Sequence, residues 1–255
     1  MIYLLLSAAS AFFGLAVGLG PTTLLRPMLD AVSPLSPASV AMICTMATLC
    51  SALISAFFAL GRPLALQQDE LILLAVGAAI GGVLGDLASA RFVAVLSRSS
   101  AVLLQNALLF TLIALPAVYF STLASTLRPL AATRLLSLPA ALFIGLLGSF
   151  LAFGAEPLTL AVYFLLFDAD NDESANAALT IALFAMAGKL ITMLIRQRMA
   201  LPDADVLLFI LPGALVGALL AMLPGLWHPS QRGADALLRL SLFTSLLNIA
   251  AASMG

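Results

Sequence analysis

The chain has few of the residues from which catalytic and metal sites are built. Among 255 residues there are one histidine, two cysteines and one tryptophan, and charged residues make up only 9% of the total. The sequence contains no phosphate-binding loop, no catalytic triad and no cluster with metal-ligand spacing. We therefore predict neither an enzyme nor a metal or cofactor site. The absence of a basic tract also argues against a nucleic-acid partner.

Most of the chain consists of long apolar runs. Hydrophobic residues make up 63% of the chain, and the mean hydropathy is +1.16, far above the range of soluble domains. A helix needs roughly 20 apolar residues to cross a bilayer, and eight apolar segments can be drawn. They run from about 2–32, 36–60, 69–89, 99–121, 137–168, 174–195, 204–224 and 234–254. The sequence thus predicts an all-α polytopic membrane protein with about eight transmembrane segments.

Two of these segments contain a sequence that should interrupt a helix. The first is Gly18-Leu19-Gly20-Pro21-Thr22-Thr23, and the second is Gly154-Ala155-Glu156-Pro157-Leu158-Thr159. Glycine loosens the backbone and proline lacks an amide donor, so each helix should stop and restart, exposing amides suited to an anion. Irregular backbone at membrane depth survives only where protein or a water-filled cavity covers it. We therefore expect the two breaks to share one central site.

The spacing of the breaks indicates an internal repeat. Shifting the sequence by 136 positions (157 − 21 = 136) places Pro21 on Pro157 and Gly77 on Gly213, and aligns the first four segments with the last four. We predict two homologous repeats, residues 1–127 and 137–255, joined by a basic linker at 128–136. The small residues at 77–85 and 213–218 are typical of closely packed helices.

The number of crossings remains open at this stage. If segments one and five cross fully, the repeats are parallel; if they fold back as re-entrant hairpins, the repeats are inverted. Full crossing places five arginines on one side and three on the other, which favours that topology with both termini in the cytoplasm. The first group is Arg62, Arg128, Arg134, Arg196 and Arg198, and the second is Arg91, Arg98 and Arg232.

Polar residues inside the apolar segments are the candidates for a site. An unpaired Glu156 would cost about 2.5 kcal/mol or more, so it must face a cavity or a partner, as a proton carrier, a substrate ligand or a helix cap. Lys189 lies too deep to snorkel and could face the cavity or pair with Glu156. We read Arg26 and Asp30 as a structural pair. The candidate substrate-binding residues are Gly18, Gly20, Pro21, Thr22, Thr23, Thr48, Gly154, Glu156, Pro157, Thr159 and Lys189.

Four further polar residues lie near segment ends, where an interfacial position would explain them. They are Asp86, Gln105, Asn106 and Asn248.

The breaks and their surroundings resemble a known family. The Gly-x-Gly-Pro break, followed by Leu24 to Leu29, Ser36 to Val40 and Gly77 to Gly85, is similar to the sulfite exporter TauE/SafE family, also called toluene-sulfonate uptake permeases. The resemblance covers most of both halves. It implies about eight helices from a duplicated unit, in a transporter of sulfite, sulfonates or related organic acids in the bacterial inner membrane.

The sequence as a whole predicts a secondary transporter that moves a small anion through a central site at the two breaks. Glu156 makes proton coupling an open question. The alternative is a structural or assembly membrane protein whose polar groups are all satisfied internally. Substrate identity, transport direction and homodimer formation are not specified by these residues.

Overall fold

The structure is a computed structural model that describes residues 1–32, 35–59, 66–96, 98–119, 130, 133–196, 204–223 and 231–254. Every regular element within these ranges is helical. The arginines Arg62, Arg128 and Arg198, and the single histidine His228, lie outside the described residues.

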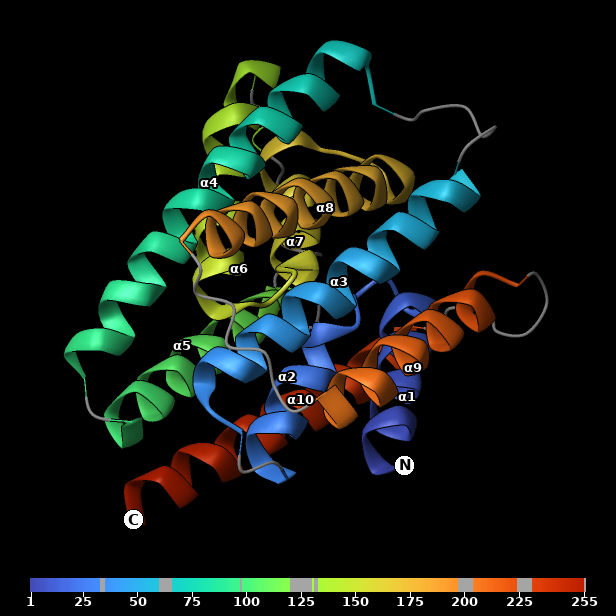
Figure 1. Cartoon of the computed structure of the whole chain (residues 1–255). Helices are drawn as coiled ribbons and strands as arrows, with labels where there is room; N and C mark the ends of the chain where they lie inside the picture. The colour runs from blue at the N-terminus through green and yellow to red at the C-terminus, as the bar shows by residue number, and fades with distance from the viewer. Residues whose placement is uncertain are drawn as a thin grey trace.

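Ten α-helices and one 3-10 turn make up the described chain (Figure 1). They are α1 (Ile2–Ala16), α2 (Thr22–Val32), α3 (Pro37–Ala59), α4 (Gln68–Val95), α5 (Arg98–Val118), η2 (Arg134–Leu136), α6 (Ser137–Leu151), α7 (Glu156–Phe167), α8 (Asn171–Ile195), α9 (Ala204–Met222) and α10 (Gln231–Met254). The all-helical class predicted from the sequence is confirmed.

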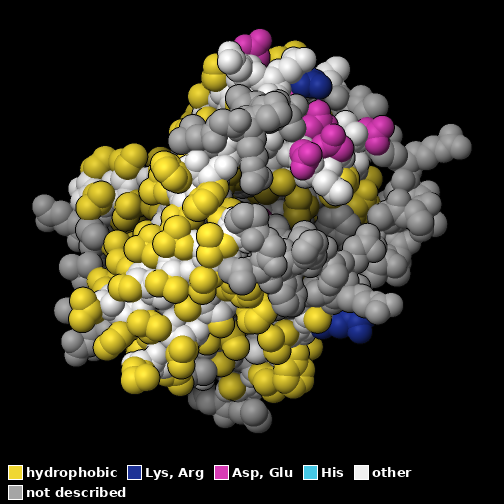
Figure 2. Space-filling model, turned by 90° about the vertical axis from the view of Figure 1, so that its right-hand side faces the viewer, with side chains coloured by type: hydrophobic (Ala, Val, Ile, Leu, Met, Phe, Trp, Pro, Cys, Tyr) yellow, Lys and Arg dark blue, Asp and Glu magenta, His cyan; other side chains and the backbone are white. Residues whose placement is uncertain are grey.

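Four stretches of helix are long and apolar enough to cross a membrane by length and composition. They are Pro37–Ala59, Gln68–Val95, Arg134–Leu151 and Asn171–Ile195. Large apolar side chains also cover the outside of the molecule: Leu53, Phe57, Ile72 and Phe143 are each more than half exposed. Figure 2 shows a broad hydrophobic area on one face, with acidic side chains gathered at one end of it. Such a surface suits lipid, because apolar patches of this extent are rare on soluble monomers.

Glycine rows set the closest helix contacts. A Cβ atom at Gly77, Gly81 or Gly85 of α4 would overlap backbone oxygens of α6, and a Cβ at Gly213 or Gly217 of α9 would overlap backbone oxygens of α1. The prediction that these small residues serve helix packing is therefore confirmed. Small side chains let backbones approach where lipid gives no hydrophobic drive for association. In Figure 1, α1 accordingly lies beside α9, and α4 lies along α6.

The matched contacts correct the register of the internal comparison. Gly77 contacts Leu138 while Gly213 contacts Leu4. The two glycines are 136 positions apart, but their partners are 134 apart (138 − 4 = 134). Helices α2 and α7 also begin 134 positions apart (156 − 22 = 134). The position that corresponds to Glu156 is therefore Thr22 rather than Gly20.

The second interrupted segment folds back on itself. The amide of Leu130 donates to the carbonyl of Leu165 at 2.9 Å, so the start of α6 lies beside the end of α7. Arg134 and Glu173, which full crossing would place on opposite sides, line one small cavity. This fold-back of segment five agrees with the re-entrant alternative, and the side of the membrane on which each arginine lies stays a prediction.

Candidate functional site

The first break is a glycine-terminated helix end. Helix α1 closes with the amide of Leu19 donating to the carbonyl of Gly14 at 2.8 Å, and that of Gly18 to Leu15 at 3.0 Å. This is the Schellman arrangement, which needs a left-handed residue just past the helix. Gly18 supplies it with φ 75°, and Gly20 takes a second left-handed turn with φ 74°. Helix α2 then begins at Thr22, with the carbonyl of Pro21 accepting its first backbone bond from Leu25.

The second break ends its first helix in the same way with different residues. The amide of Phe153 donates to the carbonyl of Gly148 at 2.7 Å, and Ala152 occupies the left-handed position with φ 50°. Ala155 takes the second left-handed turn with φ 58°, and helix α7 begins at Glu156 with Pro157 in its first turn. Alanine here accepts a conformation that glycine adopts without cost.

The two breaks touch each other. The amide of Gly154 donates to the hydroxyl of Thr22 at 2.9 Å, across 132 positions of sequence. The carboxyl group of Glu156 lies directly against the Cα atoms of Gly20 and Gly154, because a Cβ at either glycine would overlap it. The starts of α2 and α7, each with the partial positive charge of a helix N-terminus, are thus brought to one place.

Glu156 is buried at this contact. The residue is 7% exposed, and its Oε2 atom has no hydrogen-bond partner among the described residues. The carboxyl is hydrogen-bonded by the backbone of Glu156 itself, but an ionised carboxylate without a charged partner is costly at membrane depth. The geometry therefore suits a carboxyl group that carries its proton, or one that leaves this position when it is charged.

Lys189 has partners other than Glu156. Its Nζ atom is fully buried, donates to the carbonyl of Ser149 and lies 3.9 Å from Oδ1 of Asp86. The hypothesis that Lys189 pairs with Glu156 is wrong for this structure. The last turn of α6 leaves carbonyl groups without helical partners at the break, and a cation is favourable there.

Arg26 holds the same helix end from another direction. Its Nη1 donates to the carbonyl of Leu151, its Nη2 to Gln105 at 3.0 Å, and its Nε to Asp30 at 3.4 Å. The Arg26–Asp30 pair is therefore present, and it is part of a larger network. Asn106 donates to Asp30 at 3.5 Å, and Asn248 donates to the backbone of α2.

The four polar residues near segment ends are buried within the protein. Asp86, Gln105, Asn106 and Asn248 are all at most 7% exposed. Asp86 lies beside Lys189, Gln105 accepts from Arg26, and Asn106 donates to Asp30, whereas Asn248 donates to the backbone of α2.

The remaining predicted site residues are threonines and prolines around the breaks. The hydroxyl of Thr23 donates to the carbonyl of Leu19, and that of Thr159 donates to Ala155 at 3.0 Å. Thr48 on α3 is 1% exposed, and its hydroxyl has no partner among the described residues. Thr22, Thr23 and Thr159 thus lie at the breaks, whereas no described hydrogen bond links Thr48 to them.

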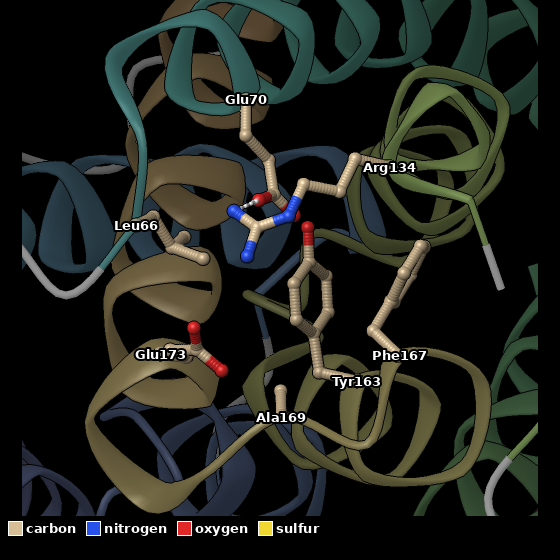
Figure 3. Close-up of a pocket in the computed structure, with 7 residues that line it drawn as sticks. All are labelled: Leu66, Glu70, Arg134, Tyr163, Phe167, Ala169 and Glu173. Atoms are coloured by element: carbon tan, nitrogen blue, oxygen red, sulfur yellow. Dashed lines mark hydrogen bonds and ion pairs between the residues drawn. The ribbon is translucent and has the colours of Figure 1, made fainter. Parts of the chain in front are cut away.

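A small cavity of about 60 Å³ lies where α6 begins and α7 ends (Figure 3). Glu70, 4% exposed, accepts from Arg134 at 2.9 Å and from Ser137 at 3.0 Å. Figure 3 shows the hydroxyl of Tyr163 pointing toward the Glu70–Arg134 pair. The Glu70–Arg134 pair therefore links the start of α4 to the start of α6.

Several of these residues escape sequence reasoning. Glu70 lies in a polar stretch at the start of α4, which the sequence alone suggests is a loop, and Tyr163 lies within an apolar run. Ser241 donates to the carbonyl of Thr23, which Pro27 leaves without its usual helical donor. The internal proline in α2 is the one sequence signal that could have predicted an external donor.

These features define a class. A helical protein with a lipid-suited surface, whose interrupted helices bring their N-termini and buried charges together, is typical of secondary transporters. The chain belongs to the sulfite exporter TauE/SafE family, whose model matches residues 3–251. No curated protein and no solved structure gives a significant match. The family assignment supports a multi-pass membrane transporter.

Proposed function

We propose that this protein is a secondary transporter that moves a small anion across the bacterial inner membrane. The anion is sulfite, an organosulfonate or a related organic acid, and it binds where the two breaks meet. The observation that carries the proposal is the contact between the breaks: Gly154 bonded to Thr22, with the buried Glu156 between Gly20 and Gly154. A site placed there is reached by both hairpins and by two helix N-termini.

The binding residues have separate tasks in this proposal. Gly18, Gly20 and Gly154 shape the backbone, and Pro21 and Pro157 stand at the helix starts, where no helical acceptor is available for an amide. Thr22, Thr23, Thr159 and Thr48 supply hydroxyl groups. Lys189 supplies positive charge beside the second break, where Asp86 and the end of α6 hold it.

The architecture we propose is an inverted repeat. Residues 1–127 and 137–255 each form one re-entrant hairpin and three crossing helices, with 128–136 as the linker. The matched contacts of α4 with α6 and of α9 with α1 support this arrangement, because each half packs its glycine row on the first helix of the other. An odd number of crossings per half inverts the second repeat.

Transport by purified protein in liposomes tests the proposal. We expect uptake of labelled sulfite, and its inhibition by methanesulfonate, above that of protein-free liposomes. Thr22→Val removes the hydroxyl that accepts from Gly154 and should lower uptake at least several-fold. Thr111→Val is the matched control, because Thr111 is exposed and bonds only back to its own helix at 2.9 Å. Absence of uptake and of thermal stabilisation by any anion would favour a structural membrane protein.

Proton coupling through Glu156 makes a second test. Glu156 can exist as acid or carboxylate, whereas Gln keeps the size and has no titrating proton. We expect wild-type uptake to change with pH, and Glu156→Gln uptake to persist without that change. The neighbouring ionisable groups Arg26, Asp30, Asp86 and Lys189 remain in both proteins. An unchanged pH profile in Glu156→Gln would show that the carboxyl only caps the helix.

A further inference from the structure

The space between the two breaks is already filled by a side chain of the protein. For a Cβ built at Gly20, and again for one built at Gly154, the three nearest atoms all belong to the carboxyl group of Glu156. Because Gly20 and Gly154 have no side chains, they leave a space between the two breaks, which we call the seat. The Glu156 carboxyl occupies this seat. No other group competes for that space in the described chain at so short a distance.

The two glycines differ in what they require. Gly20 is left-handed with φ 74°, so its backbone alone favours glycine. Gly154 has no positive φ, which means that its backbone accepts other residues. Glycine at position 154 is thus explained by the room that the Glu156 carboxyl takes, and the seat is a matter of space rather than of backbone conformation.

A ligand drawn to the two helix starts has to use the same seat. Thr22 and Glu156 are the first residues of α2 and α7, and the Gly154–Thr22 hydrogen bond holds these helix starts together. The acidic side chain that fills the space is buried, and its Oε2 has no partner among the described residues. No described hydrogen bond from another residue holds that oxygen in place, so leaving the seat costs the carboxyl only the hydrogen bond from the backbone of Glu156 itself.

We propose that Glu156 is a tethered competitor of the transported anion. Its carboxyl fills the seat formed by Gly20 and Gly154 when the site is empty, and it swings out when the oxyanion head group of the substrate enters. This inference rests on the proposed function and specifies the ligand as a small oxyanion whose head group matches a carboxyl in size. The apparent affinity is then the intrinsic affinity multiplied by the fraction of time that the seat is free, so a seat free about a tenth of the time raises the Kd about tenfold.

Binding of sodium methanesulfonate to the purified full-length protein, followed by calorimetry and thermal shift, tests the competition. Glu156→Ala empties the seat and should lower the Kd about tenfold. Glu156→Gln keeps a side chain of equal size in the seat and should leave the Kd near that of the wild type. Adding Gly154→Ala to Glu156→Ala puts a methyl group into the seat and should raise the Kd again. If Glu156→Ala does not fold, Glu156→Ser, which suits a helix start, takes its place.

The outcomes separate this inference from the proposed function. An equal fall of the Kd in Glu156→Gln and Glu156→Ala would mean that the carboxyl acts by charge repulsion. A higher Kd in Glu156→Ala would make Glu156 a ligand or a helix cap. Either result overturns the proposal that Glu156 competes with the anion. A wild type that binds methanesulfonate while the Ala variant gains nothing overturns it as well. Absence of binding in every variant overturns the proposed function together with this inference.

Discussion

The two breaks follow nearly the same backbone path with opposite choices of residue. The first uses Gly18 and Gly20 at its two left-handed positions, and the second uses Ala152 and Ala155. The two Schellman hydrogen bonds that end α1 and α6 nevertheless match at a spacing of 134 positions, whereas Gly20 donates to Gly14 and Gly154 donates to Thr22. A left-handed helix end can therefore be imposed by surrounding structure when the local residue does not favour it.

The breaks also differ in how their helix ends are held. The carbonyls that end α6 receive two buried cations, Lys189 at Ser149 and Arg26 at Leu151. Within the described residues, no charged side chain donates to the end of α1, whose Gly14 carbonyl accepts from two amides of its own loop. Buried cations thus satisfy carbonyl groups at the end of α6, whereas backbone amides of a glycine-containing loop satisfy the Gly14 carbonyl at the end of α1.

The largest expected effect comes from removing a cation from the second break. Lys189→Met keeps length but leaves Asp86 as a buried carboxylate without its cation, and it leaves the Ser149 carbonyl with only the Ala152 amide as donor. Losing one partner of a buried pair costs about 3–5 kcal/mol. We expect a fall of this size in the free energy of unfolding, measured by denaturant titration in detergent micelles.

A charge-neutral double variant serves as the control for that loss. Asp86→Asn added to Lys189→Met removes the stranded charge and should recover part of the stability. Equal stability of the single and double variants would show that Asp86 does not depend on Lys189.

Much of the fold was within reach of the sequence, because composition and apolar length alone require membrane helices. The breaks were also predictable in position, since Gly18, Gly20 and Pro21 are unusual inside an apolar run. Their direction was not, because a broken helix that crosses and one that folds back use the same local residues. The bond between Leu130 and Leu165, which decides it for the second hairpin, is a contact that no local pattern encodes.

The polar partners were beyond sequence reasoning for a related reason. Glu156 and Lys189 are both buried, as their depth in the apolar segments suggested. Which carboxylate lies beside Lys189 depends on which helices are in contact, and the sequence does not show that. Asp86, seen as interfacial, is the carboxylate that lies beside Lys189. A shift of 136 positions paired Glu156 with Gly20 because a two-residue difference between the halves is invisible in an ungapped comparison.

A middle-sized effect is expected from the proline that distinguishes the helices after the breaks. Pro27 in α2 leaves the carbonyl of Thr23 without a helical donor, and Ser241 of α10 supplies a hydroxyl instead. At the corresponding position α7 has Ala161, which keeps its amide. Ser241→Ala should lower the free energy of unfolding by about 1–2 kcal/mol, since buried hydrogen bonds between membrane helices are worth this much or less.

Restoring the backbone donor checks the cause of that loss. Pro27→Ala gives α2 an amide at position 27, so Ser241→Ala should cost much less in that background. A full loss in both backgrounds would mean that Ser241 acts through packing and not through the Thr23 carbonyl.

The smallest expected effect separates backbone conformation from space at the two left-handed helix ends. A Cβ at Gly18 would meet no atom within 4 Å, so Gly18→Ala introduces only the left-handed penalty, and we expect a loss of about 1 kcal/mol. The reverse change at the second break, Ala152→Gly, relieves that penalty but adds unfolded-state entropy and removes a fully buried methyl group. These terms oppose one another, so its unfolding free energy should stay within about 0.5 kcal/mol of the wild type. Unfolding curves of both variants under one set of micelle conditions measure the difference. A neutral Gly18→Ala together with a stabilising Ala152→Gly would reverse the comparison, and would show that the first break relaxes freely while the second is the strained one.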